Sequence, residues 1–237
     1  MTRTRSLLLA ATAAAALFAG PAQASLLQIT GGQAFTTAAN NDFAGAGWAG
    51  RNNNVALTIS ATTTVNLTFE YLFRESGFTG NRFEWTAAPT FFFVSTDRAN
   101  LAVSPPAPIP FFTRTNVPAG PLPFQFVTQA NPGNPNANGE AAEAIGPGPF
   151  PNYGFWATFN DPTGPGKGNP VNSGDTGTVL WLGFDDSGAD TDDDFDDLII
   201  RITATAVPIG VAEPASLALL GAGLMGLGFA VRRRRAG

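Results

Sequence analysis

The sequence of 237 residues contains no cysteine and no histidine, and its single lysine is Lys167. Without cysteine the chain forms no disulfide, so its fold depends on packing and hydrogen bonding alone. Without histidine it lacks the usual general base, the commonest transition-metal ligand and the Ser-His and Cys-His nucleophile pairs. The composition therefore argues against most classes of enzyme, and we expect a protein without catalytic activity.

Charged residues are scarce as well, at 13% of the chain, and they are unevenly distributed. Most of the acidic side chains lie between residues 25 and 208, where 7 basic and 17 acidic residues give a net charge of −10. A surface of that sign repels phosphate backbones, so the sequence predicts no nucleic-acid partner. It remains compatible with bound cations.

The longest uncharged apolar runs lie at the two ends of the chain. Residues 215–231 carry no charge and are followed directly by the basic residues Arg232, Arg233, Arg234 and Arg235. As a helix, at about 1.5 Å per residue, this run would be roughly 26 Å long, close to the thickness of a hydrocarbon core. Basic flanks stay on the cytoplasmic side, so the run predicts a transmembrane helix in the inner membrane.

The whole tail, 211–237, has three parts: a short motif formed by Ala212, Glu213 and Pro214, then the apolar helix, then the arginines. It resembles the PEP-CTERM sorting signal of exported bacterial proteins. Ala212 stands where that family has the first proline of its Pro-Glu-Pro motif. The resemblance implies an exosortase-type membrane enzyme as partner, which cuts near the motif. It also implies a transient membrane anchor, followed by release to the cell surface or extracellular matrix.

The N-terminus agrees with export. Arg3 and Arg5 form a basic segment, residues 7–19 an apolar segment, and Ala22 and Ala24 an A-x-A cleavage site. The arginines are not adjacent, so we expect the Sec route rather than the twin-arginine route. The predicted organisation is a helical signal peptide at 1–24, an ectodomain at 25–208 and a sorting signal at 211–237.

Between the two ends, apolar and polar residues alternate with a period of two, which is typical of half-buried strands. This alternation is cleanest at 65–71, and it predicts further strands at 55–60, 91–96, 124–128, 153–159, 178–184 and 198–207. Stretches rich in Pro, Gly and Asn separate them, and 15 of the 19 prolines fall between Pro105 and Pro170. The pattern predicts a mainly β fold, an antiparallel β-sandwich of jelly-roll type with long surface loops.

One segment has the composition of an ion site. Residues 185–197 contain eight aspartates in thirteen positions and no basic residue. Ca²⁺ accepts irregular sets of oxygen ligands and relieves the repulsion between carboxylates, so Asp190, Asp192, Asp194 and Asp196 are candidate calcium ligands. The alternative is a solvated acidic turn. Phe195 replaces the glycine that an EF-hand requires.

The same stretch, 181–202, resembles a closing β-hairpin segment common among PEP-CTERM proteins, which implies a connection within a sheet. Phe195 and Ile199 share one parity along the strand, whereas Leu198 and Ile200 have the other. Either a bulge or turn intervenes, or the strand is buried on both faces.

Four tryptophans, at positions 48, 85, 156 and 181, suit either a core or a sugar-stacking surface. Trp48 lies in a glycine-rich segment and is predicted to be the exposed one, and thus the candidate ligand residue. We expect a structural protein of the envelope or extracellular matrix. One alternative is a carbohydrate-binding module of the exopolysaccharide matrix. A weaker alternative is a glycosidase that uses two of Glu70, Glu75 and Glu84 as its catalytic carboxylates. We expect Arg74 and Arg82 to form ion pairs with these glutamates instead.

Overall fold

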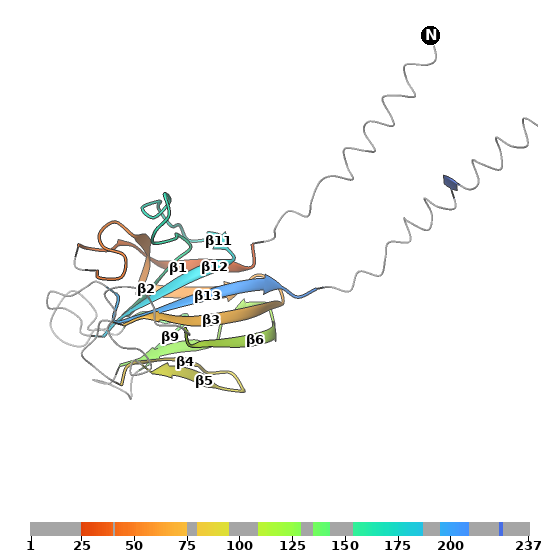
Figure 1. Cartoon of the computed structure of the whole chain (residues 1–237), viewed down its shortest axis with the longest axis horizontal. Helices are drawn as coiled ribbons and strands as arrows, with labels where there is room; N and C mark the ends of the chain where they lie inside the picture. The colour runs from red at the N-terminus through yellow and green to blue at the C-terminus, as the bar shows by residue number, and fades with distance from the viewer. Residues whose placement is uncertain are drawn as a thin grey trace, which may run out of the picture. The chain divides into compact units, whose positions relative to one another are not determined.

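The computed structural model describes residues 25–39, 41–74, 80–94, 109–128, 135–142, 154–186, 195–208 and 223–224. The chain divides into two compact units, Met1–Ala206 and Val207–Gly237. Every described strand belongs to the first unit (Figure 1). In the second unit only residues 207–208 and 223–224 are described, and of these Gly223 and Leu224 are helical. The predicted terminal helices otherwise lie outside the described residues.

Most of the strands form one large antiparallel sheet, which has nine strands within the described residues. One of its edge strands has two residues and the other has seven, and a further two-residue strand pairs beside the main path. In spatial order the strands are β11 (Thr176–Gly177), β1 (Leu27–Thr36), β2 (Ala49–Ala61), β10 (Gly154–Thr158), β12 (Val179–Asp185), β13 (Leu198–Ala206), β3 (Val65–Phe73) and β6 (Phe111–Val117), with β7 (Gly120–Pro121) on β2.

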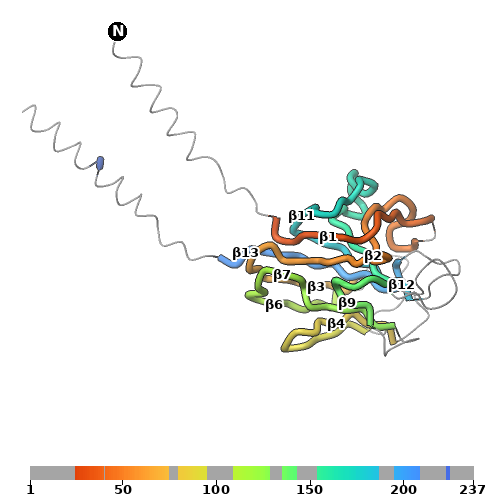
Figure 2. Tube along the Cα trace, turned by 180° about the vertical axis from the view of Figure 1, so that it is seen from behind, coloured from red at the N-terminus to blue at the C-terminus, as the bar shows by residue number. Residues whose placement is uncertain are grey.

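A second, smaller antiparallel sheet packs against one face of the large one (Figure 2). Phe69 of the large sheet contacts Phe83 of the small sheet with ring centroids 5.8 Å apart. Phe184 and Phe126 stack almost parallel at 4.9 Å. The small sheet consists, in spatial order, of β5 (Phe91–Val94), β4 (Arg82–Trp85), β8 (Phe124–Val127) and β9 (Asn136–Ala137).

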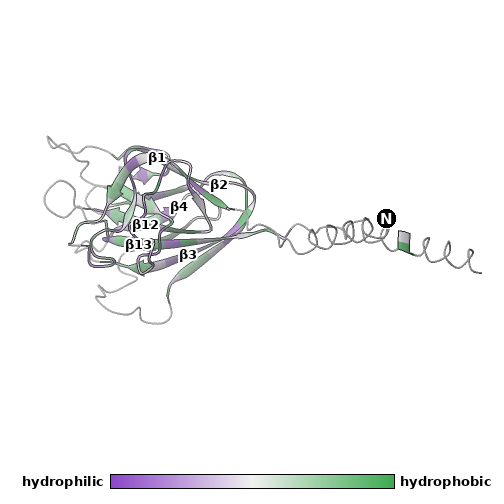
Figure 3. Cartoon of the chain, turned by 90° about the horizontal axis from the view of Figure 1, so that it is seen from above, coloured by the Kyte–Doolittle hydropathy of each residue, from purple (hydrophilic) through white to green (hydrophobic). Residues whose placement is uncertain are grey.

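The alternation in the sequence explains how the two sheets bury their facing sides. Along β3, buried and half-buried residues alternate without exception from Val65 to Phe73. Leu67 and Phe69 point into the core, whereas Thr68 and Glu70 lie on the other face. Hydrophobic and hydrophilic stretches follow one another along β3 and β13 in Figure 3. The predicted mainly β, antiparallel architecture is confirmed.

All strands that the alternation predicts are present, as β2, β3, β5, β8, β10, β12 and β13, and β2 begins six residues earlier than expected. The strands that sequence reasoning missed are β1, β4 and β6, besides the two-residue ones. β4 is too short to show a period, and β6 has exposed or half-buried residues at every position before Val117. Edge strands such as β6 are solvated on more than one side, so their pattern is weak.

β1 was missed because two glycines interrupt it. Gly31 and Gly32 have φ angles of 72° and 68°, and the pairing of β1 with β2 shifts register there. A Cβ at Gly31 would lie 2.2 Å from the carbonyl oxygen of Ala56, so only glycine fits. Arg51 holds this bulge, because its Nε donates to the Gly31 carbonyl and its Nη2 to the Gly32 carbonyl, each at 2.5 Å.

Candidate functional site

The outer face of the large sheet carries a second apolar cluster, built on three tryptophans. Trp48 packs edge-to-face on Trp156 and on Trp181, with ring centroids 4.5 Å and 5.8 Å apart. Phe43 lies against both Trp48 and Trp181. The remaining buried members are Phe73, Phe195 and Ile199. Because β10 and β12 contribute to this cluster and to the core between the sheets, both strands are buried on both faces.

Trp48 is fully buried, so the expectation that it is the exposed tryptophan is wrong. The loop 37–48 folds back over the sheet and places the indole against Trp156. The indole Nε1 donates to the carbonyl oxygen of Asn160 at 3.0 Å, which satisfies its only donor. A ring enclosed in this way offers no face on which a sugar could stack. The glycines around it belong to the loop, in which Gly45 and Gly47 have positive φ angles.

A second loop, 159–170, locks the first in place through polar contacts. The Lys167 ammonium donates to the carbonyl of Ala44, and the Ala49 amide donates to the carbonyl of Lys167 at 3.0 Å. The side-chain amide of Asn160 donates to the Ala49 carbonyl at 3.1 Å and to the Asn169 carbonyl at 2.8 Å. The one lysine of the chain therefore joins two loops over the tryptophans.

The same loop contains a carboxylate with a shifted pKa. The Thr163 hydroxyl and the Thr163 amide donate to Oδ1 of Asp161 at 2.7 Å and 2.8 Å. These hydrogen bonds, that of the hydroxyl first, lower the pKa of Asp161 because they stabilise the charged form. The side chain is exposed and closes a tight turn.

Of the predicted calcium ligands, only Asp196 is described; Asp190, Asp192 and Asp194 lie outside the described residues. Asp196 is fully buried, and its Oδ2 accepts hydrogen bonds from the backbone amides of Asp42 at 2.5 Å and Phe43 at 3.1 Å. This carboxylate therefore fastens the 37–48 loop to the closing hairpin. Among the described residues, no group of three or more His, Cys, Asp or Glu is placed to hold a metal ion. The calcium site stays a prediction, which melting curves with Ca²⁺ and with chelator would test.

The parity conflict around Phe195 has a clear structural origin. Phe195 adopts a φ of 62°, in the left-handed region, so the chain turns there before β13 begins. Its ring packs edge-to-face on Phe35 at 4.7 Å. Ile199 follows it into the tryptophan cluster, whereas Leu198 and Ile200 join the core between the sheets. The pairing of β13 with β3 also shifts register between Ile199 and Ile200, so the turn, the bulge and the double burial all occur.

The glutamates weighed as a glycosidase pair lie on different faces of the sandwich. Glu70 is on the outer face of the large sheet and accepts from Arg201 Nε at 2.7 Å and Nη2 at 2.8 Å. Glu84 is on the outer face of the small sheet, paired with Arg82 as expected and also bound by Gln125 at 2.6 Å. Glu75 lies outside the described residues. The structure does not bring Glu70 and Glu84 together, and it makes Arg201 the partner of Glu70.

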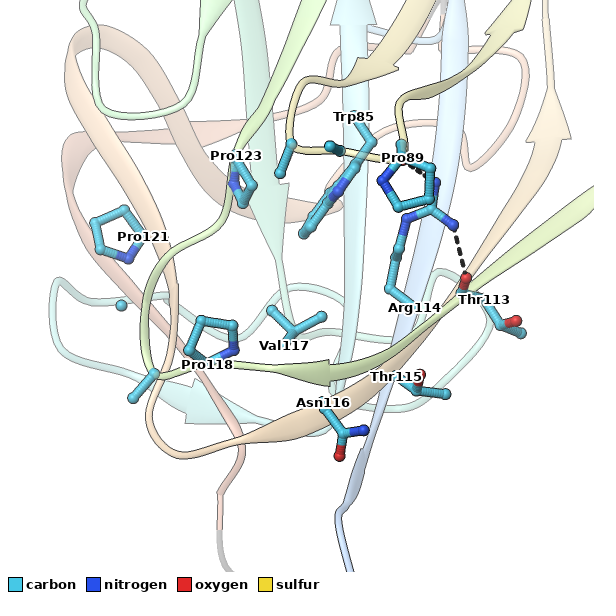
Figure 4. A pocket seen from close by; sticks show the side chains of 14 residues that line it. Trp85, Pro89, Thr113, Arg114, Thr115, Asn116, Val117, Pro118, Pro121 and Pro123 are labelled. Atoms are coloured by element: carbon cyan, nitrogen blue, oxygen red, sulfur yellow. Dashed lines mark hydrogen bonds between the residues drawn. The ribbon is translucent and has the colours of Figure 1, made fainter.

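A pocket of about 520 Å³ lies where the β4–β5 turn meets the segment from the end of β6 to β8 (Figure 4). The indole of Trp85 lies between Pro89 and Pro123 in this pocket. Val117 and Pro118 line the side opposite the indole. The walls are therefore apolar and proline-rich around one aromatic ring.

Arg114 supplies the single charged side chain among the residues that line this pocket. Its guanidinium donates to the carbonyl oxygen of Thr113 at 3.0 Å and to that of Pro89, and it lies 4.6 Å from the ring centroid of Phe91. Its Nε is buried and donates to no atom of the described part of the chain. The proline content of this region predicts only surface loops, and the pocket is not evident from it.

Comparison with known families gives one match. Residues 211–235 match the family model of the PEP-CTERM protein-sorting motif. The chain carries a PEP-CTERM sorting motif. It is therefore an exported protein, transiently anchored in the membrane and sorted by an exosortase, which is a membrane enzyme. No curated protein and no solved structure matches the chain.

The PEP-CTERM match contains every sorting residue predicted from the sequence: Ala212, Glu213, Pro214, Arg232, Arg233, Arg234 and Arg235. These residues, like the cleavage residues Ala22 and Ala24, lie outside the described residues. In the part of the chain that the structure describes, no helix has the length and apolarity needed to cross a membrane.

Proposed function

We propose that this PEP-CTERM protein is a non-enzymatic structural component of the bacterial envelope or its extracellular matrix. It is exported by the Sec route, and its signal peptide is removed after Ala24. The apolar run 215–231 then holds it in the inner membrane with Arg232–Arg235 on the cytoplasmic side. Cleavage near Glu213 and Pro214 releases the ectodomain to the cell surface or matrix.

The observation that carries this proposal is the match of residues 211–235 to the sorting motif. The motif supports an exported protein that is processed at its C-terminus, and the A-x-A sequence at 22–24 supports processing at its N-terminus. Both ends then act as targeting signals that are removed by processing, so the β unit between them forms the mature protein.

The proposed lack of enzymatic activity rests on the residues themselves. The chain has no histidine or cysteine, and two of the three glutamates considered for a glycosidase are engaged in ion pairs, Glu70 with Arg201 and Glu84 with Arg82. A general acid and a general base must both reach one substrate bond, at carboxyl separations of roughly 5–9.5 Å. Glu70 and Glu84 face outward from different sheets, which supports a structural role for each.

Mass spectrometry of the protein recovered from the surface of its host tests the proposal. We expect a mature chain that begins at Ser25 and lacks Arg232–Arg235. Replacing these four arginines with serine should impair membrane retention or orientation, whereas replacing them with lysine should not, because lysine keeps the charge that opposes translocation. Surface-exposed protein that retains all four arginines would contradict processing by an exosortase.

A further inference from the structure

We propose that the pocket around Trp85 and Arg114 binds a uronic acid unit of an acidic polysaccharide. This inference goes beyond sorting and localisation, because it concerns what the β unit recognises. It also differs from a binding module built on Trp48, which is enclosed by its own loop.

The pocket has the size and rigidity of a preformed ligand site. Its volume of about 520 Å³ falls within the range of roughly 300–1,000 Å³ that small-molecule sites occupy. Four prolines line it, at positions 89, 118, 121 and 123. Proline has a fixed φ, so these walls lose little conformational freedom when a ligand binds.

The apolar walls match one side of a sugar ring. Trp85 and Val117, which are only 3% and 7% exposed, form the floor of the pocket, so the apolar surface that a ligand meets is mainly that of Pro89 and Pro123 beside them (Figure 4). A pyranose has a face of C–H groups that packs on such surfaces, whereas a fully polar ion would lose hydration there without compensation. The walls therefore favour a ring with an apolar face.

Arg114 makes the pocket selective for an acid. It forms no ion pair with any described residue, and no acidic side chain lines the pocket, so the pocket itself is positively charged although the ectodomain as a whole has a net charge of −10. Its two hydrogen bonds, to the carbonyls of Thr113 and Pro89, fix the guanidinium plane and leave other N–H groups for a ligand. A planar guanidinium held in this way matches the two oxygens of a carboxylate.

The remaining lining residues match the hydroxyl groups of a sugar. The hydroxyls of Thr113 and Thr115 and the side-chain amide of Asn116 line the pocket and make no hydrogen bond within the described part of the chain. Hydroxyl and amide groups both donate and accept, which suits the hydroxyls of a carbohydrate. A uronic acid is a ligand that combines the apolar face, the hydroxyls and the carboxylate.

Titration calorimetry of the full-length chain in a polyoxyethylene detergent, which contains no sugar, tests this assignment. The probes are trigalacturonate, triglucuronate and the methyl esters of both, which keep the ring and remove the charge. We expect at least one acid to bind about tenfold more tightly than its ester. Arg114→Gln should weaken that binding by about tenfold to a hundredfold, since hydrogen bonds to charged groups contribute about 1.5–3 kcal/mol.

Arg82→Gln is the matched control, because it removes the same charge from a half-buried ion pair on the outer face of the small sheet. It should leave the affinity unchanged. Asn116→Gly is a second variant, for the case that Arg114→Gln impairs folding: Asn116 has a φ of 57°, which glycine adopts readily. It should weaken binding about twofold to tenfold through the loss of one neutral hydrogen bond.

Three results would overturn the proposal: no binding of either acid, equal affinity for acid and ester, or binding that Arg114→Gln and Asn116→Gly leave unchanged. None of these results bears on export or C-terminal processing, which the mass of the mature chain reports independently.

Discussion

The two faces of the large sheet are buried by different means. The inner face is covered by a second sheet, and its contacts are almost all between apolar side chains that alternate along the strands. The outer face is covered in part by the loops 37–48 and 159–170, which lie over three tryptophans and are fixed by polar groups. Burial on the inner face follows from strand period, whereas burial on the outer face depends on specific hydrogen bonds.

Burial on the inner face is therefore set by neighbouring residues in the sequence, whereas burial on the outer face is set by residues far apart in the sequence. Leu67 and Phe69 face the core because of their own position in β3. Trp48 is buried because Asp196 holds the amides of Asp42 and Phe43 across a separation of more than 150 residues in the chain. We therefore expect substitutions on the two faces to differ in size and in what they disturb.

The largest effect is expected on the inner face. Phe69 is fully buried and contacts Phe83, Trp85 and Phe91. Phe69→Ala should lower the free energy of unfolding by about 3–5 kcal/mol, because it leaves a cavity in the core. Thr68→Ala on the opposite face should stay within about 0.5 kcal/mol. Urea denaturation of both variants measures the difference, and equal losses would show that the register of β3 is wrong.

A smaller effect is expected where the loop is fastened to the hairpin. Asp196→Ala removes the acceptor of two backbone amides, and a buried donor without a partner costs about 1–3 kcal/mol. We expect a loss of about 2–3 kcal/mol, because water entering under the opened loop offsets part of the penalty. Hydrogen exchange should show faster exchange at Asp42 and Phe43, while amides of β3 keep their relative protection. Asp196→Asn retains one acceptor oxygen and should lose less than Asp196→Ala.

Packing under the tryptophans gives a third test. A Cβ at Gly183 would lie 2.2 Å from Nε1 of Trp156 and 2.3 Å from the carbonyl oxygen of Phe195. Gly183→Ala should therefore destabilise the fold by about 1–3 kcal/mol through overpacking. Adding Trp156→Phe, which removes the clashing edge of the indole, should make the double variant more stable than the sum of the two single losses. Additive losses would show that Trp156 and Gly183 do not meet.

The smallest effect concerns pH and is confined to the loop side. Thr163→Val removes the hydroxyl that does most to lower the pKa of Asp161, so that pKa should rise toward its usual value. A lowered pKa stabilises the fold above the unfolded pKa, and this contribution disappears as pH falls through the folded value. The variant should therefore lose less free energy of unfolding than the wild type as the pH falls. This difference should be small because the carboxylate is exposed. A carboxyl carbon NMR titration measures the shift, and an unchanged pKa would contradict the assigned cause.

The sequence predicted the inner face better than the outer one for the same physical reason. Alternation at 65–71 carries the orientation of each side chain within a few residues, so β3 was correctly placed. Nothing near Trp48 signals that Asn160 and Asp196 lie beside its loop, so its burial was not predictable from local pattern. The parity of Phe195 and Ile199 did signal an irregularity, either a bulge or turn or burial on both faces, because a regular strand with one buried face keeps its apolar residues on one parity. The sorting motif is a continuous segment and was recognised directly, whereas the pocket joins residues from separate turns.

The position of β13 determines how the domain responds to a pull on its C-terminal tail. β13 is the last strand and lies inside the large sheet, with β12 on one side and β3 on the other. Hydrogen bonds in antiparallel pairs run perpendicular to the strands, so tension along β13 would shear the hydrogen bonds to both neighbours. These bonds would resist the force at the same time instead of breaking one after another. An edge strand would instead peel away from a single neighbour. The sorting signal thus follows a strand that is paired on both sides, which would help the domain stay folded if an exosortase pulls on its tail.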